Sequence, residues 1–486
     1  MSVAVNPVGV NGRFNNTDVG NANRLATRFG DVLRYVDKWH TWLHFDSIRW
    51  DKVSDNTVIG LAKQVLTSMK EEALQLGNNP EKEAEARELG AWAYQSEKGT
   101  HLGLMVEYAK SELLATPEDF DRNPWFFNAL DCTIDLYTGL THPHTSSDMI
   151  TKVAGTAYDK DADGTRFYRF IDEITGGDGG LAEYLQMVLG LSLTGDTSEK
   201  HVWFPYGDGD NGKTLLFEIT GEVMGDYAEV GQTSDIIDHG GHVVKPFGII
   251  KLVGVRRAVF AETQEGDKLN WNVLKQMSGS DTMSIEEKFK TPISSRLEAK
   301  VFIYTNVLPT VEQVGEAEWG RIRVIPFTEC FSDERRECKG KDGRLIDKLR
   351  ANMPAILRWL VGGELLRREY GLVEPVAVTE ATKVYREESD DMTDFLAECT
   401  YKDRSAMTSL KDIYAAYKRW YQGDAWDIPK DSEIGKRVRA HGYIGKKSRG
   451  VMKYKGIGLK PGYEPEASGP FGKIYGAYVE PISTGR

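Results

Sequence analysis

The chain has 486 residues, and its 61 basic and 73 acidic side chains give a formal net charge of −12. That balance excludes a uniformly basic nucleic-acid coat, although a local basic patch remains compatible with it. With 40% hydrophobic residues the composition excludes disorder, and the length suggests about three domains.

The sequence shows no sign of export or membrane insertion. No apolar run approaches about 18 residues, and the N-terminus lacks a basic start followed by an apolar core. The cysteines form no C-x-x-C pair, which predicts reduced thiols of a cytoplasmic protein rather than disulfides or a zinc site. They are Cys132, Cys330, Cys338 and Cys399.

Residues 1–150 are predicted to form an α-rich accessory domain. Apolar residues at helical spacing mark three stretches, 22–29, 58–76 and 83–113. Short strand-like pieces between the first two carry four aromatic residues, Trp39, Trp42, Phe45 and Trp50. A strand, a turn and a second strand are expected over 126–139.

Residues 151–388 are predicted to form an α/β domain with at least part of its sheet parallel. Short apolar strands alternate there with helical patterns, which is typical of a layered α/β fold. The expected strands are 201–206, 258–261, 301–304 and 322–327. Helix is expected again over 343–390, with a break at Pro375.

A phosphate-binding loop follows the first of these strands. It fits the pattern G-x-x-x-x-G-K-[ST] with Gly207, Asp208, Gly209, Asp210, Asn211, Gly212, Lys213 and Thr214. The glycines let the backbone approach phosphates, and the helix after them presents its free amides. Lys213 is expected to reach the β- and γ-phosphates of ATP, and the Thr214 hydroxyl to hold Mg²⁺.

Three further residues complete a hydrolysis site at the ends of later strands. Glu262 is expected to bind Mg²⁺ or to orient the attacking water, with Glu265 as an alternative catalytic base. Asn306 is expected to contact the γ-phosphate or the water. Arg321 is a candidate arginine finger for the site of a neighbouring subunit.

Residues 389–486 are predicted to form a winged-helix-like DNA-binding domain. Residues 434–460 hold nine bases and no acid. Two helix-like pieces, 409–421 and 432–441, precede a hairpin-like stretch, and that order is typical of a winged helix. The bases expected to bind duplex or forked DNA are Arg437, Arg439, Lys446, Lys447 and Arg449.

The succession of these motifs resembles the superfamily 3 helicases, in the branch of poxvirus-type and phage or plasmid primase–helicases. A segment of the family, "lKeltGgD", is matched by residues 274–281 (LKQMSGSD). Flanking matches extend the resemblance over residues 15–396. It implies an AAA+-like core, a hexameric ring with ATP between subunits, and translocation on DNA.

The resemblance also implies a channel hairpin, and it shows departures. The hairpin corresponds to residues 285–290, where Lys288 and Lys290 are expected to contact phosphates and Phe289 a base or sugar. Gly320 stands where relatives often have Arg, which favours Arg321 as the finger. Thr263 stands where many have a second acid.

We therefore expect an ATP-dependent DNA helicase of a phage, plasmid or similar element, acting in the host cytoplasm. No primase domain is expected, so a separate primase or polymerase would be a partner. The alternative is a P-loop ATPase that acts as a replication initiator or DNA-remodelling switch. A small-molecule kinase is disfavoured, because it does not require Asn306, Arg321 and the basic C-terminal region together.

Overall fold

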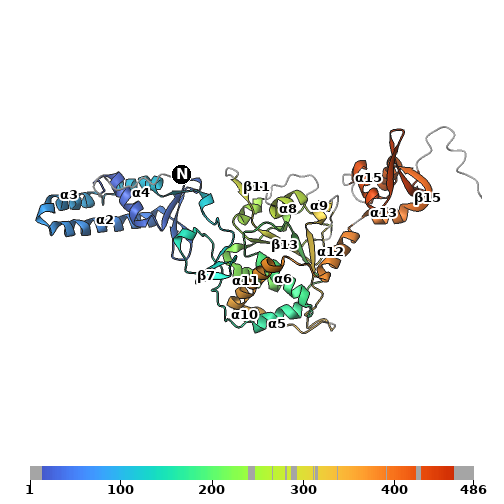
Figure 1. The fold of residues 1–486 in the computed structure, drawn as a ribbon, viewed down its shortest axis with the longest axis horizontal. Helices are drawn as coiled ribbons and strands as arrows, with labels where there is room; N and C mark the ends of the chain where they lie inside the picture. Colours follow the sequence, from blue (N-terminus) through green and yellow to red (C-terminus); the bar gives the residue numbers. More distant parts are fainter. Residues whose placement is uncertain are drawn as a thin grey trace, which may run out of the picture. The chain divides into compact units, whose positions relative to one another are not determined.

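The fold is described from a computed structural model of the chain (Figure 1). Contacts divide the chain into two compact units. The first holds residues up to 309 together with 321–379, and the second holds 310–320 together with 380–486. The structure describes residues 14–238, 247–264, 266–279, 282–285, 293–309, 311, 316–336, 338–389, 391–422 and 428–464.

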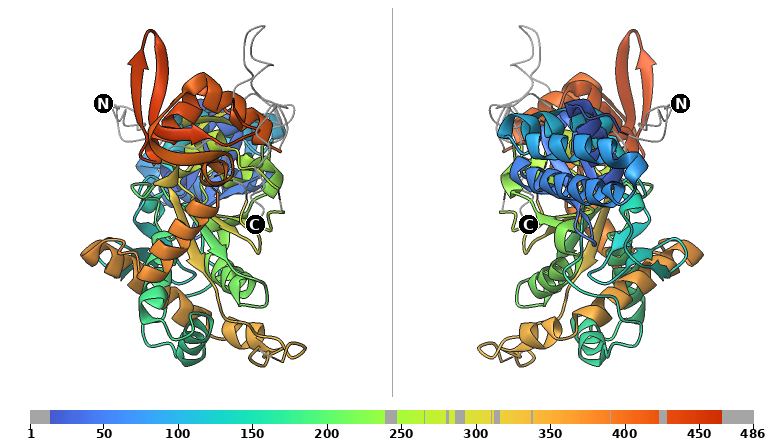
Figure 2. Two further views of the ribbon diagram at one scale, coloured as in Figure 1. Left: turned by 90° about the vertical axis from the view of Figure 1, so that its right-hand side faces the viewer. Right: turned by 90° about the vertical axis from the view of Figure 1, so that its left-hand side faces the viewer.

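The first unit begins with helices packed on a small sheet, the blue elements of Figure 2. The helices are α1 (Asp18–Phe29), α2 (Asp55–Gly77), α3 (Glu83–Gln95) and α4 (Gly99–Glu112). The sheet has the order β3-β2-β1-β4, with β1 (Leu33–Val36), β2 (Thr41–Phe45), β3 (Trp50–Val53) and β4 (Leu114–Ala115). The expected α-rich region is confirmed, although the stretch 83–113 forms two helices rather than one.

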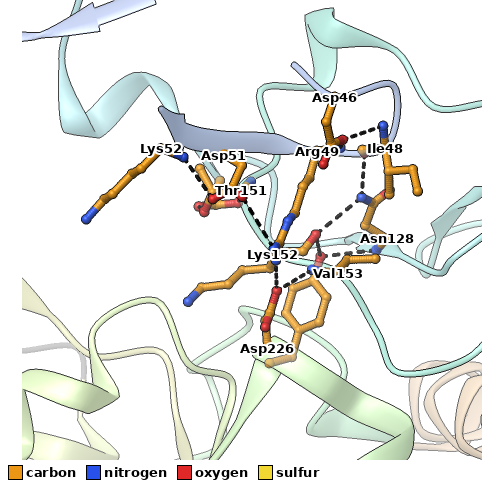
Figure 3. A network of polar contacts seen from close by, with 12 residues as sticks. Asp46, Ile48, Arg49, Asp51, Lys52, Asn128, Thr151, Lys152, Val153 and Asp226 are labelled. Carbon is orange, nitrogen blue, oxygen red and sulfur yellow. Dashed lines mark hydrogen bonds and ion pairs between the residues drawn. The ribbon is translucent and has the colours of Figure 1, made fainter. Parts of the chain in front are cut away.

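A polar network ties this region to the rest of the unit (Figure 3). A second small sheet pairs β5 (Phe126–Asn128), β6 (Thr133–Asp135) and β7 (Leu140–His142). The buried Asn128 amide donates to the carbonyl oxygens of Ile48, at 2.8 Å, and Lys152, at 3.2 Å. Arg49 forms an ion pair with Asp226. The turn between β2 and β3 is thereby fixed to the α/β part of the unit.

The centre of the first unit is a five-stranded parallel sheet with the order β14-β8-β13-β10-β9. Its strands are β8 (Val202–Tyr206), β9 (Ala228–Val230), β10 (Arg257–Ala261), β13 (Lys300–Tyr304) and β14 (Ile322–Pro326). Strands buried on both faces read as continuous apolar runs, which is why four of the five are visible in the sequence. The structure confirms the α/β class and the parallel sheet.

Helices cover this sheet and complete its core. They are α5 (Thr165–Ile174), α6 (Gly179–Leu191), α7 (Lys213–Met224), α8 (Trp271–Ser278), α10 (Leu345–Arg350) and α11 (Met353–Tyr370). Helices α6 and α11 approach closely at Gly190, where a Cβ would lie 2.5 Å from the Leu360 carbonyl oxygen. A short hairpin, β11 (Thr282–Ile285) with β12 (Ile293–Arg296), also belongs to this unit.

The second unit is a small α/β body, and its part from residue 380 onward is drawn in orange and red in Figure 1. It contains α9 (Glu316–Trp319), the end of α12 (Val376–Glu388), α13 (Asp391–Cys399), α14 (Leu410–Trp420) and α15 (Asp431–Ala440). Its antiparallel sheet has the order β15-β17-β16, with β15 (Thr400–Ser409), β16 (Ile444–Ser448) and β17 (Val451–Leu459). No helix in the described part of the chain has the length and apolar composition of a membrane span.

Candidate functional site

The loop between β8 and α7 needs glycine at three positions. A Cβ on Gly207 would lie 2.1 Å from the carbonyl oxygen of Phe327, and one on Gly212 would lie 2.5 Å from Ile174. Gly209 and Gly212 also have φ angles of 91° and 83°, which favour glycine. The loop therefore has the close-packed, left-handed turns that a phosphate cradle requires.

Lys213 is buried at the start of α7, where its ammonium group meets two oxygen atoms. Its Nζ donates to the Gly207 carbonyl at 2.6 Å and to Asn306 Oδ1 at 3.0 Å. Burial lowers the pKa of Lys213 to about 8, and the charge of Asp208 acts in the opposite direction. Among the described residues no acid forms an ion pair with Lys213, so the buried cation favours an anionic ligand.

Two neighbouring strands bring Glu262 and Asn306 to the same edge of the sheet. Glu262 directly follows the carboxyl end of β10, and Asn306 lies two residues beyond the carboxyl end of β13. Both strands run parallel to β8. Glu262 has a φ of 54° and donates its backbone N–H to the Tyr304 carbonyl at 3.0 Å. Such conformations cluster at functional sites.

The departure at residue 263 has a structural explanation. The Thr263 hydroxyl is hydrogen-bonded to the Thr305 hydroxyl at 2.7 Å and lies 2.8 Å from the Val307 carbonyl oxygen. The side chain thus links the ends of β10 and β13 instead of carrying a second charge. The other proposed base, Glu265, lies outside the described residues.

The loop, Glu262 and Asn306 line one cavity of about 850 Å³. It includes Gly209 to Thr214, but Gly207 and Asp208 are not among its lining residues. Thr214 and Glu262 supply the oxygen atoms that suit Mg²⁺, which needs few protein ligands when phosphates and water complete its shell. Among the described residues no cluster of three or more His, Cys, Asp or Glu forms a separate metal site.

The opposite wall of the cavity was not foreseen from the sequence. It comes from α5 and from residues 331–348, which contribute Arg166, Arg169, Phe170, Phe331, Lys339, Lys341, Leu345 and Lys348. The Lys- and Gly-rich run at 339–343 is the one local signal of this wall. These side chains supply bases and apolar surface beside the phosphate loop. The acids Glu173 and Asp342 of the same wall pair with Arg166, Arg169 and Lys348.

A disulfide closes the loop that carries part of this wall. Cys330 and Cys338 are bonded, which corrects the expectation that these two cysteines are reduced. The reason is local: Phe331 and Lys339 pair as neighbouring backbone segments, which brings the adjacent cysteines together. The same loop holds Asp210, through the Phe331 N–H at 2.6 Å and an Arg335 ion pair at 2.6 Å.

Arg321 lies at the amino ends of the parallel strands, whereas the cavity lies at their carboxyl ends. It precedes β14, which runs parallel to β8 with Ile322 beside Val202, whereas the phosphate loop follows β8. Its guanidinium donates to the Ser278 hydroxyl at 3.0 Å, on α8. A five-residue strand, about 16 Å long, separates the two ends. Arg321 is therefore not positioned to serve the cavity of its own subunit.

The residues proposed to contact DNA fall into three groups. Lys288, Phe289 and Lys290 lie outside the described residues, beyond the end of β11. Arg437 pairs with Asp391 at 2.7 Å, and Arg439 donates to the Tyr454 hydroxyl at 3.1 Å. Exposed side chains on and after β16 make up the third group, which is Lys446, Lys447 and Arg449.

In comparisons with known proteins, two family models each match a part of the chain. The family "D5 N terminal like" matches residues 22–176, and the "Family of unknown function (DUF5906)" matches residues 206–321. The "Putative helicase L207/L206" of Acanthamoeba polyphaga mimivirus is 25% identical over 63% of this chain and 34% of its own length. The "Putative helicase 022R" of Frog virus 3 is 25% identical over 59% of this chain and 30% of its own.

The chain thus spans about a third of the length of these two relatives. A solved apo structure of the NrS-1 C-terminal region is 10% identical, with a TM-score of 0.49, over 90% of this chain and 98% of that chain.

Proposed function

Because this chain belongs to the D5-like helicase–primase family, of the superfamily 3 helicase type, we propose that it is an ATP-dependent DNA helicase. It acts as a homo-hexameric ring that translocates on DNA during replication of a phage, plasmid or similar element, in the host cytoplasm. The observation that carries this proposal is the convergence of Lys213, Asn306, Glu262 and Thr214 on one cavity.

Each residue of the cavity has a distinct part in the proposed hydrolysis of ATP. The loop amides and the start of α7 bind the phosphates, and Lys213 neutralises the β- and γ-phosphoryl oxygens. Glu262 orients the attacking water and accepts its proton, while Asn306 hydrogen-bonds the γ-phosphate. Thr214 would hold Mg²⁺ directly and Glu262 would contact it through a water, and the ion would supply charge neutralisation at the phosphates.

The position of Arg321 supports a site shared between subunits. An arginine finger stabilises charge that develops on the transferred phosphoryl group. Arg321 faces away from its own cavity, so a neighbouring subunit of a ring is the partner that it can serve. We propose AAA+-like ATPase architecture for residues 151–388 on this basis, with the accessory domain in 1–150.

The second unit supports a DNA-binding role. Its order of helix, strand, two helices and two strands, with β17 central in the sheet, supports a winged-helix-like domain over 389–486. The exposed Lys446 and Lys447 precede a two-residue turn formed by Arg449 and Gly450, where both φ angles are positive. We propose that this hairpin binds duplex or forked DNA.

Strand displacement on a forked duplex tests the proposed function. Wild type is expected to release the labelled strand only with ATP and Mg²⁺, and Lys213→Ala is expected to release none. ATP hydrolysis by wild type without any displacement would contradict the helicase and would favour a replication initiator or DNA-remodelling switch.

A further inference from the structure

The sheet of the second unit has two chemically different faces. Tyr454, Ile457 and Leu459 of β17 are buried against the helices of the unit. The pairing register places the residues opposite Gly458, Lys455, Lys453 and Val451 on the other face, here called the outer sheet face. The register of β15 against β17 shifts between Lys402 and Met407, which is why Tyr454 and Ile457, three residues apart, are both buried. Its members are Tyr401, Met407, Ile444, Lys446, Val451, Lys453 and Lys455.

The outer sheet face carries three lysines, Lys446, Lys453 and Lys455, and its strands are basic as a whole. The three strands, all of whose residues are described, contain six bases and the single acid Asp403. The Asp403 carboxylate accepts hydrogen bonds from Ser405 within β15. Lys446 lies directly opposite Lys453 in the ladder, and like charges at such positions are destabilising. Neither lysine forms an ion pair with a described residue, so an external anion would relieve this repulsion.

The same face exposes apolar surface and an aromatic ring. Ile444 is 76% exposed, Met407 48% and Val451 44%, so apolar side chains lie on the same face as the lysines. Tyr401 is 47% exposed and its ring covers Gly458, where a Cβ would lie 2.3 Å from the Tyr401 Cζ atom. The glycine allows the ring to lie on the sheet, as a platform for stacking.

Helix α15 offers less to a ligand than this face does. Arg437 is paired with Asp391, Arg439 is bonded to Tyr454, and Lys436 pairs with Glu433 at 3.0 Å. These bases are engaged inside the unit. Lys446, Lys453 and Lys455 of the outer sheet face form no ion pair or hydrogen bond through their side chains with a described residue.

We propose that the outer sheet face binds single-stranded DNA, an inference that rests on the proposed function. Lys446, Lys453 and Lys455 contact successive phosphates, and a base stacks on Tyr401 beside the apolar side chains. Lysines for the backbone and an exposed aromatic ring for the bases are the combination that single strands require. A duplex keeps its base faces stacked internally and cannot use the ring.

Binding and crosslinking with the full chain, without nucleotide, test this proposal. The probes are a fluorescent thymidine oligomer, a duplex of equal length, and an oligomer carrying 5-iododeoxyuridine. The variant Lys446→Ala/Lys453→Ala/Lys455→Ala is expected to bind the oligomer roughly tenfold more weakly. Its salt slope should fall by about 2, because each phosphate contact to a single strand contributes about 0.7. Photocrosslinking of wild type should mark Tyr401.

A matched control removes three exposed lysines of the same unit, in Lys411→Ala/Lys418→Ala/Lys430→Ala. It should keep the wild-type affinity and slope. Tyr401→Ala should weaken oligomer binding about tenfold and duplex binding not at all, while Tyr401→Phe retains both. Equal losses for oligomer and duplex in Tyr401→Ala, a loss in the triple-lysine variant no larger than the control's, or no crosslink at Tyr401 would each overturn the proposal. ATP hydrolysis by wild type, measured separately, shows whether the proposed function itself holds.

Discussion

At the scale of single residues, Lys213 sets how this site responds to pH. Its folded-state pKa of about 8 lies below the ordinary lysine value of 10.5, because burial disfavours the charged form. Burying the charged lysine lowers the free energy of unfolding. This cost is fully present below pH 8 and declines as the lysine becomes neutral between about pH 8 and 10.5. A bound triphosphate favours the charged form, so binding restores the proton.

ATP affinity should therefore fall above pH 8. We expect at least a tenfold weaker binding of a non-hydrolysable ATP analogue at pH 9.5 than at pH 7.5, since each pH unit above the pKa costs up to tenfold. Calorimetry at pH 8.5 in two buffers of different ionisation enthalpy should detect proton uptake. Lys213→Arg should bind the ATP analogue with an affinity that does not change over this pH range. Equal wild-type affinities at both pH values would refute the role of Lys213 in the pH dependence.

Glu262 should matter for hydrolysis rather than for binding. Glu262→Gln is expected to lower DNA-stimulated ATP turnover by about 10²–10⁴-fold, the range for loss of a general base, with little change in ATP affinity. Glu183→Gln, an exposed change on α6, is the control. If Glu265→Gln rather than Glu262→Gln lost turnover, the role of base would pass to Glu265.

At the scale of elements, the loop closed by Cys330 and Cys338 shapes the phosphate-binding loop. Its backbone and Arg335 both hold Asp210, and Lys339 and Lys341 line the cavity. The disulfide spans eight positions. In the chain-entropy model, closing so short a loop lowers the conformational entropy of the unfolded chain, which stabilises the folded state by about 2.5 kcal/mol. The bond thus favours the conformation that contacts Asp210.

Breaking this bond should weaken ATP binding. Dithiothreitol-reduced wild type and Cys330→Ser/Cys338→Ser are expected to bind ATP several-fold more weakly than oxidised wild type. The double variant should show no further effect of reductant. Cys132→Ser is the control, because Cys132 is free in the structure. Identical affinities before and after reduction would show that the loop does not depend on the bond.

The same scale shows what the sequence could predict. The strands β8, β10, β13 and β14 are apolar runs, and their ends carry the predicted Lys213, Glu262 and Asn306. Strand β15 was not expected, because most of its side chains are polar and exposed. The second wall of the cavity and the disulfide depend on packing between distant segments, which local periodicity does not encode.

At the scale of the whole molecule, the carboxyl ends and the amino ends of the parallel strands carry different halves of one proposed site. The carboxyl ends hold Lys213, Glu262 and Asn306, and the amino ends hold Arg321. In the proposed head-to-tail ring, Arg321 of one subunit would meet the cavity of the next at every interface. Neither half is sufficient alone in this account, so each subunit depends on its neighbour.

Mixing two inactive variants tests this claim most directly. Lys213→Ala and Arg321→Ala should each lack DNA-stimulated ATP hydrolysis when assayed alone. After subunit exchange at equal amounts, about a quarter of the sites should recover, because half the subunits supply an intact loop and half supply the arginine. Recovery of hydrolysis in the mixture is the predicted result. An inactive mixture whose subunits have demonstrably exchanged, or full activity of Arg321→Ala alone, would contradict the account.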